Sequence, residues 1–151
     1  LKEGERMDGS KELVACCGVY CGDCFSYKGE IADMARELRK KLREEKFTRV
    51  AQGLSGVFKD FQNYEQCYQV LGAMVRLRCK KACLEGGGNP FCAIRKCCQG
   101  KKLQGCWECQ GFENCDRFEF LKTVHKDANL KNLRELKKQG IEDFLKGTRY
   151  W

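Results

Sequence analysis

Apolar residues recur at helical spacing in the first third of the chain. The apolar positions follow one another at steps of three, four and four residues: Ile31, Met34, Leu38 and Leu42. This spacing places them on one face of a helix, while charged residues fill the other face. The pattern predicts a helix over about residues 30–46, in which Met34 is expected to fill the core.

A second run of apolar residues predicts a helix, in one or two pieces, over residues 48–78. Its members alternate steps of four and three: Val50, Leu54, Val57, Phe61, Tyr64, Tyr68, Leu71 and Val75. Gly53 and Gly56 weaken the first half, because glycine has low helix propensity. Asn63, followed three residues later by Gln66, resembles a capping box that would begin the second piece.

Helical spacing returns near the C-terminus and predicts helices over residues 116–146. The apolar positions of its later part are Leu130, Leu133, Leu136, Ile141, Phe144 and Leu145. Gly140 falls within this run and is expected to separate two short helices, since glycine commonly ends a helix. No apolar run approaches the length that a membrane-spanning helix needs.

Between residues 79 and 115 the periodicity disappears. Large aliphatic residues are few there, and the run Gly86-Gly87-Gly88-Asn89-Pro90 indicates turns. We therefore expect a mainly α fold, a small helical domain with a cysteine-rich, loop-dominated metal-binding region. After a polar segment over residues 1–15, residues 16–151 are expected to form a single domain, with metal loops at residues 16–28 and 79–115.

Thirteen cysteines lie among the 151 residues, and ten of them form short clusters. Two cysteines separated by about two to four residues can wrap one turn so that both sulfurs face a zinc ion about 2.3 Å away. Two such pairs complete a tetrahedral site, and the bound metal supplies folding energy. We expect two or three zinc ions, held by Cys17, Cys21, Cys24, Cys79, Cys83, Cys92, Cys97, Cys106, Cys109 and Cys115.

An iron–sulfur cluster is the alternative cofactor, because all-cysteine sites suit both zinc and clusters. The spacing of Cys17, Cys21 and Cys24 also matches the three-cysteine motif of radical S-adenosylmethionine enzymes. Those enzymes build a full or partial parallel barrel after the motif, whereas this chain offers helices and loops. We therefore expect no catalytic residues, and the fourth ligand of these three thiolates is expected to be another protein cysteine.

Three cysteines lie outside the clusters and are candidates for free thiols: Cys16, Cys67 and Cys98. Cys67 falls in an apolar helical run and is expected to be a small core residue. His125, the only histidine, follows Cys115 by ten residues and can serve as a fourth ligand or as the base of a Cys/His pair, although a lone histidine is more often neither. Aromatic residues among the ligands, such as Trp107, are expected to cover the metal sites with apolar surface.

Disulfides are the competing use of so many cysteines. The odd cysteine count and the lack of a visible signal peptide favour reduced thiols in a cytoplasmic protein. The formal net charge of +8 treats each cysteine as neutral. A zinc ion with four thiolates carries a net charge of −2, so two sites leave about +4 and three leave about +2. The basic balance is therefore weak evidence for a nucleic-acid partner.

The order of these clusters resembles the bacterial and archaeal family called domain of unknown function 3795. The resemblance runs from Cys-Gly-x-x-Cys-x-x-Cys through two helices to Cys-x3-Cys, Cys-x4-Cys and Cys-x2-Cys-x5-Cys, over roughly Cys17 to Phe144. Its most specific parts are the segments Cys92–Cys97 and Cys106–Cys115. The resemblance implies a small cysteine-rich, metal-binding domain whose pattern is carried by the ten clustered cysteines.

These features predict a metal-binding protein in which zinc is the favoured metal. The protein is expected to act as a binding or scaffold module for a protein partner. Catalysis is the less favoured class. The alternative function is an iron–sulfur redox or electron-transfer protein. A nucleic-acid-binding zinc protein is less favoured because thiolate ligands cancel much of the positive charge, and no membrane partner is expected.

Overall fold

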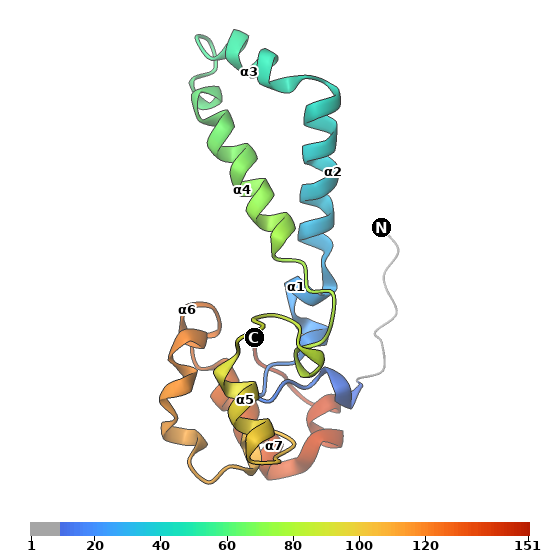
Figure 1. The fold of residues 1–151 in the computed structure, drawn as a ribbon, viewed down its shortest axis with the longest axis vertical. Coiled ribbons are helices and arrows are strands. Elements are labelled where there is room, and N and C mark those ends of the chain that lie inside the picture. Colours follow the sequence, from blue (N-terminus) through green and yellow to red (C-terminus); the bar gives the residue numbers. More distant parts are fainter. Residues whose placement is uncertain (1–9) are drawn as a thin grey trace. The chain divides into compact units, whose positions relative to one another are not determined.

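The computed structural model describes residues 10–151, whose backbone divides into two compact units (Figure 1). One unit is Gly29–Cys79, and the other combines the segment before Gly29 with Lys80–Trp151. Among the described residues there is no strand, only an isolated antiparallel bridge between Val14 and Tyr20. The mainly α fold is thus confirmed, whereas the single domain over residues 16–151 stays a prediction. Of the predicted polar segment, residues 1–9 lie outside the described residues.

The Gly29–Cys79 unit is built from three helices. α2 (Glu30–Glu44) packs against α4 (Tyr64–Arg76), and α3 (Phe47–Leu54) follows α2 in the chain (Figure 1). The helix predicted over residues 30–46 is confirmed to within two residues. The side chains that this helix buries differ from those that the sequence predicts.

The buried face of α2 is rotated from the face that the apolar spacing predicts, although Leu42 of the predicted stripe is half-buried. Ala32 and Ala35 are buried, whereas Met34 is 74% exposed, and Ile31 and Leu38 are about half exposed. Small side chains on the buried face allow a second helix to approach closely, as larger ones would not. The expectation that Met34 fills the core is therefore wrong.

An arginine and a glycine complete the contact between α2 and α4. The guanidinium of Arg39 lies 4.4 Å from the centre of the Tyr68 ring. The same guanidinium would be 3.0 Å from a Cβ added at Gly72, a buried residue of α4. Arginine can cover apolar surface with its stem and stack its planar head on an aromatic ring, so it fills space that a glycine leaves open.

The predicted helix over residues 48–78 is divided into separate pieces. α3 ends before Gly56, and a 3-10 turn, η3 (Lys59–Asn63), leads into α4. The capping box is not formed, because the Asn63 side chain makes no capping hydrogen bond. Cys67 is exposed, so its prediction as a core residue is also wrong. It precedes the half-buried Tyr68 by one residue and therefore lies about 100° from it around the helix.

The other unit contains short helices and 3-10 turns around one long helix, α7 (Ala128–Lys146). Its remaining elements are η1 (Lys11–Leu13), η2 (Cys21–Asp23), α1 (Phe25–Lys28), η4 (Cys83–Glu85), α5 (Ala93–Gly100), η5 (Cys106–Glu108), η6 (Phe112–Asn114), η7 (Asp116–Leu121) and α6 (Lys122–His125). The prediction of helices over residues 116–146 is confirmed for α6 and α7. The sequence interpretation missed α5, which lies in the predicted loop 79–115, because only Ile94 and Cys98 mark its buried face.

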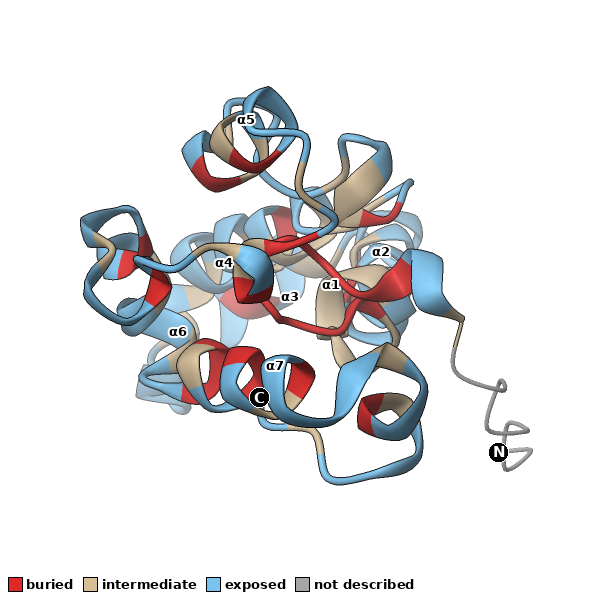
Figure 2. Ribbon diagram, turned by 90° about the horizontal axis from the view of Figure 1, so that it is seen from below, coloured by how far each residue is buried: buried red, intermediate tan, exposed pale blue. Residues whose placement is uncertain are grey.

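The core of this unit joins the N-terminal segment to α7 (Figure 2). Its most deeply buried apolar side chains include Val14, Ile94, Leu133, Leu136 and Phe144. α7 is interrupted at Gly140, whose φ of 81° and ψ of 172° are not helical, as the sequence predicts. The break allows residues on both sides of it to reach one core.

Within the described residues, no helix combines the length and apolar character required to cross a bilayer.

Polar contacts tie the end of the chain to this core. Asn132 is fully buried, and its side chain exchanges two hydrogen bonds of 2.8 Å with the backbone of Tyr150. Arg149 donates to both carboxylate oxygens of Asp23, at 2.7 and 3.2 Å. It also lies 4.7 Å from the centre of the Tyr20 ring. These contacts hold η2, which begins at a predicted ligand, against the C-terminal segment.

Candidate metal centre

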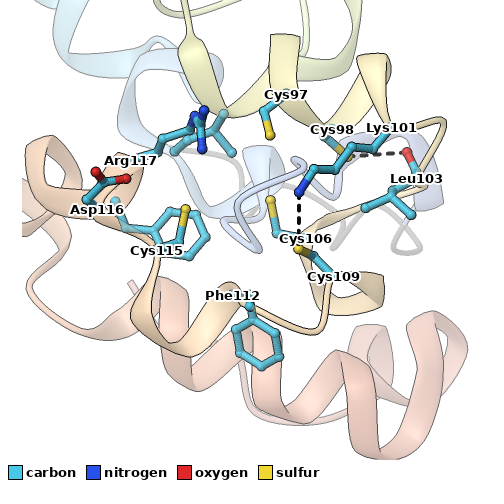
Figure 3. Close-up of a pocket in the computed structure, with 13 residues that line it drawn as sticks. Cys97, Cys98, Lys101, Leu103, Cys106, Cys109, Phe112, Cys115, Asp116 and Arg117 are labelled. Atoms are coloured by element: carbon cyan, nitrogen blue, oxygen red, sulfur yellow. Dashed lines mark hydrogen bonds between the residues drawn. The ribbon is translucent and has the colours of Figure 1, made fainter.

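Five cysteines line a cavity of about 250 Å³ (Figure 3): Cys97, Cys98, Cys106, Cys109 and Cys115. All but Cys98 are among the ten predicted metal ligands. Apolar residues, including Ile94, Phe112 and Phe118, form much of the remaining wall. Several thiols around a partly apolar cavity are the donor chemistry that zinc and iron–sulfur clusters require.

Single 3-10 turns position three of these four thiols. In the first, the Cys109 N–H donates to the Cys106 carbonyl at 3.0 Å, so the two cysteines lie at the ends of one turn. In the second, the Cys115 N–H donates to the Phe112 carbonyl at 3.3 Å. Cys97 comes from α5. A tight turn like the first brings two cysteines with two residues between them to the same side of the backbone.

Buried aromatic residues anchor the same two turns to the core. Trp107 lies between Cys106 and Cys109 and is 8% exposed, and Phe112 at the start of the second turn is 2% exposed. Gly105 precedes the first turn, and a Cβ there would lie 1.8 Å from the Trp107 ring. The absence of a side chain at Gly105 therefore allows the indole to fold back beneath the cysteines. Both aromatic residues are thus buried at these turns, whereas their role as a cover over bound metal stays a prediction.

Two cations face the thiols of the cavity (Figure 3). The Lys101 ammonium lies 3.7 Å from the Cys109 sulfur. A hydrogen bond to the Cys115 thiolate and the charge of Cys97 raise the pKa of Arg117 above its usual value. Cations at this distance favour thiolates over thiols, since they offset the negative charge that deprotonation creates.

Burial acts in the opposite direction on the Cys106 thiol. Desolvation, with smaller contributions from Cys98 and Cys17, raises the pKa of Cys106 far above its usual value. A thiol in this environment stays protonated unless a metal cation stabilises the thiolate. In its protonated form Cys106 is a poor nucleophile, because nucleophilic attack requires the thiolate.

The first cysteine cluster lies on a tight hairpin-like loop. The Ala15 N–H donates to the Val19 carbonyl, and the Gly18 N–H donates to the Ala15 carbonyl, both at 2.9 Å. Gly18 has a φ of +86°, and a Cβ there would lie 3.0 Å from Leu133 and 3.1 Å from a backbone oxygen of α7. Burial raises the pKa of Cys17, on this loop, to about 12. The loop therefore packs Gly18 against α7, with the half-buried Cys17 next to it.

Cys21 and Cys83 are neighbours, although 62 residues separate them in sequence. The Cys83 N–H donates to the Cys21 sulfur at 3.3 Å. Hydrogen bonding from the Cys83 side chain, opposed by burial and assisted by this backbone donor, lowers the pKa of Cys21 to about 7. Hydrogen bonds to a sulfur stabilise its thiolate, which is the metal-binding form.

Cys16 and Cys98, the two buried cysteines outside the family pattern, are neighbours. Burial and a hydrogen bond with Cys98 raise the pKa of Cys16 to about 12, and the Cys98 thiol donates to the Leu103 carbonyl at 3.2 Å. The Cys106 N–H donates to the Cys16 carbonyl at 2.8 Å, which ties the first cluster to the cavity turns. Cys16 and Cys98 are 5% and 2% exposed, so they act as packed core thiols here.

The ten predicted ligands are thus distributed unequally. Four line the cavity, and four others belong to or pack against the core: Cys17, Cys21, Cys83 and Cys92. Cys24 is half-buried outside that core, and Cys79 belongs to the Gly29–Cys79 unit. Within residues 10–151, no three cysteine, histidine or carboxylate side chains converge closely enough, as they stand, to hold one metal ion. Metal ligation by these cysteines therefore stays a prediction.

His125 packs against an aromatic ring at the chain end. Its imidazole makes an edge contact with Trp151, with ring centroids 4.5 Å apart. Its Nδ1 is buried without a hydrogen-bond partner, and burial lowers the pKa of the imidazole. These contacts give His125 a packing role.

Sequence reasoning missed two kinds of residue at these sites. Lys101 and Arg117 were assigned to no role, although each follows a cysteine of the pattern by a few residues. Arg95 was also overlooked; its guanidinium donates to four backbone carbonyls, those of Cys83, Gly87, Asn89 and Pro90. A basic residue within one helical turn of a cysteine, as at Lys101, is the signal that could have found the cations.

A protein-family model described as protein of unknown function (DUF3795) matches residues 13–120, which is more than half of the chain. The chain belongs to this family. The match ends at Phe120, so residues 121–144 of the resemblance expected from the sequence lie beyond it. All ten pattern cysteines of this DUF3795 member fall inside the matched range. No curated protein and no solved structure matches the chain.

Proposed function

We propose that this protein is a metal-binding scaffold and that one of its metals is held by Cys97, Cys106, Cys109 and Cys115. The observation that carries the proposal is that these four thiols, contributed by α5 and two adjacent turns, face one cavity. Zinc is the first choice because closed four-sulfur sites that hold loops together are its usual structural form.

A structural role fits this set better than catalysis does. A catalytic zinc keeps one coordination position open for water or substrate, whereas four protein thiolates leave none. The surrounding segment, residues 79–115, also contains few large aliphatic residues. Metal binding would therefore contribute folding free energy that the segment's own apolar residues do not.

The experiment is elemental analysis of protein purified without added chelator. We expect a Cys109→Ser/Cys115→Ser variant to lose about one metal equivalent per chain relative to the unmodified protein. Cys67→Ser is the matched control, because Cys67 is exposed on α4 and should retain the full metal content. Unchanged metal content in the double variant would contradict the proposal.

An iron–sulfur cluster with a redox or electron-transfer function is the second candidate, and the cavity volume favours it. Around one zinc ion, sulfurs at about 2.3 Å leave no internal space. A cavity of about 250 Å³ has instead the volume of roughly eight water molecules. The cations Lys101 and Arg117 would offset the charge of such a cluster and raise its reduction potential. Absorption near about 400 nm in protein isolated without oxygen would favour this candidate, and a colourless zinc protein would exclude it.

The partner of the scaffold is proposed to be another protein. The support is the apolar stripe of α2, where Ile31, Met34 and Leu38 are 50%, 74% and 48% exposed. Side chains of this size on one helix face suit an apolar protein surface better than a phosphate backbone. We place this function in the cytoplasm, where thiols stay reduced. Binding to nucleic acid that weakens steeply with salt would instead support the less favoured nucleic-acid function.

A further inference from the structure

Cysteines outside the cavity form a second group with its own internal contacts. The backbone N–H of Cys83 points at the Cys21 sulfur at 3.3 Å. Backbone donors aimed at sulfur are a common feature around metal-bound thiolates, since they spread the negative charge of the ligand. This contact joins two pattern cysteines that come from distant parts of the sequence.

Cys17 and Cys92 extend the same group. Cys21 belongs to the apolar core of the unit, and Cys17, Cys83 and Cys92 all pack against it. The charges that act on the Cys17 thiol are, in order, those of Cys92, Cys16 and Cys21. Four pattern thiols, two from the N-terminal loop and two from residues 83–92, therefore belong to or border the same core.

Arg95 links the loop that follows Cys83 to the start of α5, next to Cys92. One guanidinium nitrogen donates to the carbonyls of Cys83 and Gly87 at 2.7 and 3.0 Å. Another donates to the carbonyls of Asn89 and Pro90 at 2.9 and 3.3 Å. Because Arg95 lies in the first turn of α5, three residues after Cys92, it folds the loop that starts at Cys83 back onto the beginning of that helix.

The other two thiols are fixed independently. Cys17 lies beside Gly18, whose close approach to α7 sets the position of the loop. Cys21 begins η2, and that turn ends at Asp23, which the guanidinium of Arg149 holds by two hydrogen bonds. These four cysteines are thus held by backbone and arginine contacts, and a hydrogen bond from the Cys106 N–H to the Cys16 carbonyl links the loop of Cys17 to the cavity turns.

We propose that Cys17, Cys21, Cys83 and Cys92 form a second metal site, separate from the cavity site and specific for a thiophilic metal such as zinc. The assignment rests on the proposed function in that both sites take the same class of metal. It divides eight of the ten pattern cysteines into two four-sulfur sites. Cys24 and Cys79 are left outside both, and the buried Cys98 lines the cavity without being assigned as a ligand.

The test is the zinc content of the full-length chain loaded with zinc under reducing conditions. We expect about two zinc ions per unmodified chain and about one in a Cys21→Ser/Cys92→Ser variant. Cys24→Ser is the matched control and should retain both ions. Two ions in the Cys21/Cys92 variant, or the loss of one ion in Cys24→Ser, would overturn the assignment.

The cavity variant Cys109→Ser/Cys115→Ser separates this proposal from the proposed function. If it loses one ion while Cys21→Ser/Cys92→Ser retains both, the cavity site stands and the second site fails. If only the Cys21/Cys92 variant loses an ion, the second site stands and the cavity site fails. A chain that binds no zinc or iron at all overturns both.

A measurement on the unmodified chain covers the case in which serine variants do not fold. N-ethylmaleimide should modify Cys24 and Cys67 in zinc-loaded protein, with Cys21, Cys83 and Cys92 protected. Removing zinc with a chelator should expose these three thiols, as read by mass spectrometry of peptides. Modification of Cys83 or Cys92 in the zinc-loaded state would contradict the proposal.

Arg95 is a positioning residue for this site. In the Cys109→Ser/Cys115→Ser background, Arg95→Gln should weaken zinc binding about tenfold or more, because lost outer contacts of metal ligands have effects of this size. Arg95→Lys should rescue little, since an ammonium does not reproduce the guanidinium's fork of donors. In the Cys21→Ser/Cys92→Ser background, zinc affinity at the cavity should stay unchanged by either substitution, and an equal loss there would indicate a general folding role instead.

Discussion

At the scale of single residues, the backbone around the first cysteine cluster depends on Gly18. Its φ of +86° is a conformation that residues with a side chain rarely adopt. A Cβ would also approach Leu133 and the Asn129 carbonyl at 3.0 and 3.1 Å. The loop that carries Cys16 and Cys17 can therefore lie against α7 only with glycine at this position.

Gly18→Ala should lower the free energy of unfolding by about 1–3 kcal/mol, because it adds backbone strain and a close contact at once. Gly100→Ala is the matched control. Gly100 lies in α5 with no atom within 4 Å of an added Cβ, so alanine there should raise stability by about 0.5–1 kcal/mol. Urea unfolding of both variants measures the difference, and equal stabilities would refute the role given to Gly18.

The stability of the fold is expected to depend on pH through His125. Burial lowers the pKa of its imidazole in the folded state, so the unfolded chain binds the proton more strongly. Its neutral form is compatible with the fold above the ordinary histidine pKa of about 6.5, and stability is lost as the pH falls below that value.

The measurement compares the native chain with His125→Phe, which keeps an aromatic ring beside Trp151. We expect the variant to gain stability relative to the native chain as the pH falls from about 7.5 to about 5.5. Since His125 is the only histidine, the difference reports this side chain alone. A difference that does not change with pH would show that burial leaves its titration unaffected.

At the scale of elements, α2 shows that the buried face of a helix can be rotated from its stripe of large apolar residues. The apolar stripe through Met34 is exposed, while Ala32 and Ala35 are buried. Close contact between α2 and α4 favours small residues, and Arg39 with Tyr68 covers the space beside Gly72. Three large apolar residues of the stripe, Ile31, Met34 and Leu38, therefore stay about half exposed or more.

Ala35→Leu should destabilise the Gly29–Cys79 unit by about 1–3 kcal/mol, since the added carbons have no space on the buried face. Met34→Ser should change stability by less than about 0.5 kcal/mol, as expected for an exposed position. Thermal unfolding followed by circular dichroism compares the two. The reverse order of effects would mean that the apolar stripe is the packed face.

At the scale of the whole molecule, the pattern cysteines are concentrated in one of the two units. Nine of the ten lie in the unit that contains Lys80–Trp151, and only Cys79 belongs to Gly29–Cys79. The core of the cysteine-rich unit includes Trp107, between two proposed ligands. Metal binding and folding are therefore expected to be coupled in this unit and independent in the helical one.

Removal of metal by a chelator should shift the fluorescence of Trp107 to longer wavelength, because the indole, 8% exposed in the fold, becomes hydrated. The measurement uses a Trp151→Phe background, since Trp151 is 42% exposed and adds a solvent-exposed signal. Part of the helical circular dichroism should persist, contributed by α2 and α4. Unchanged fluorescence after complete metal removal would argue against a structural metal.

The sequence by itself determined the helical class, the extent of α2, the break at Gly140 and the cysteine pattern that defines the family. These features depend on neighbours a few residues apart, so local periodicity and spacing are sufficient to predict them. It did not determine α5, whose buried face consists of only two residues, or the exposure of Met34 and Cys67.

Only the tertiary structure decided which cysteines from distant parts of the sequence lie near one another. Cys83 meets Cys21 across 62 residues, and Lys101 and Arg117 reach thiols of the cavity through the fold of their loops. Spacing along the chain groups Cys24 with its sequence neighbours, but grouping in space depends on which segments pack together. Contacts between distant segments are set by the packing of the whole unit, and one sequence carries no local signal for them.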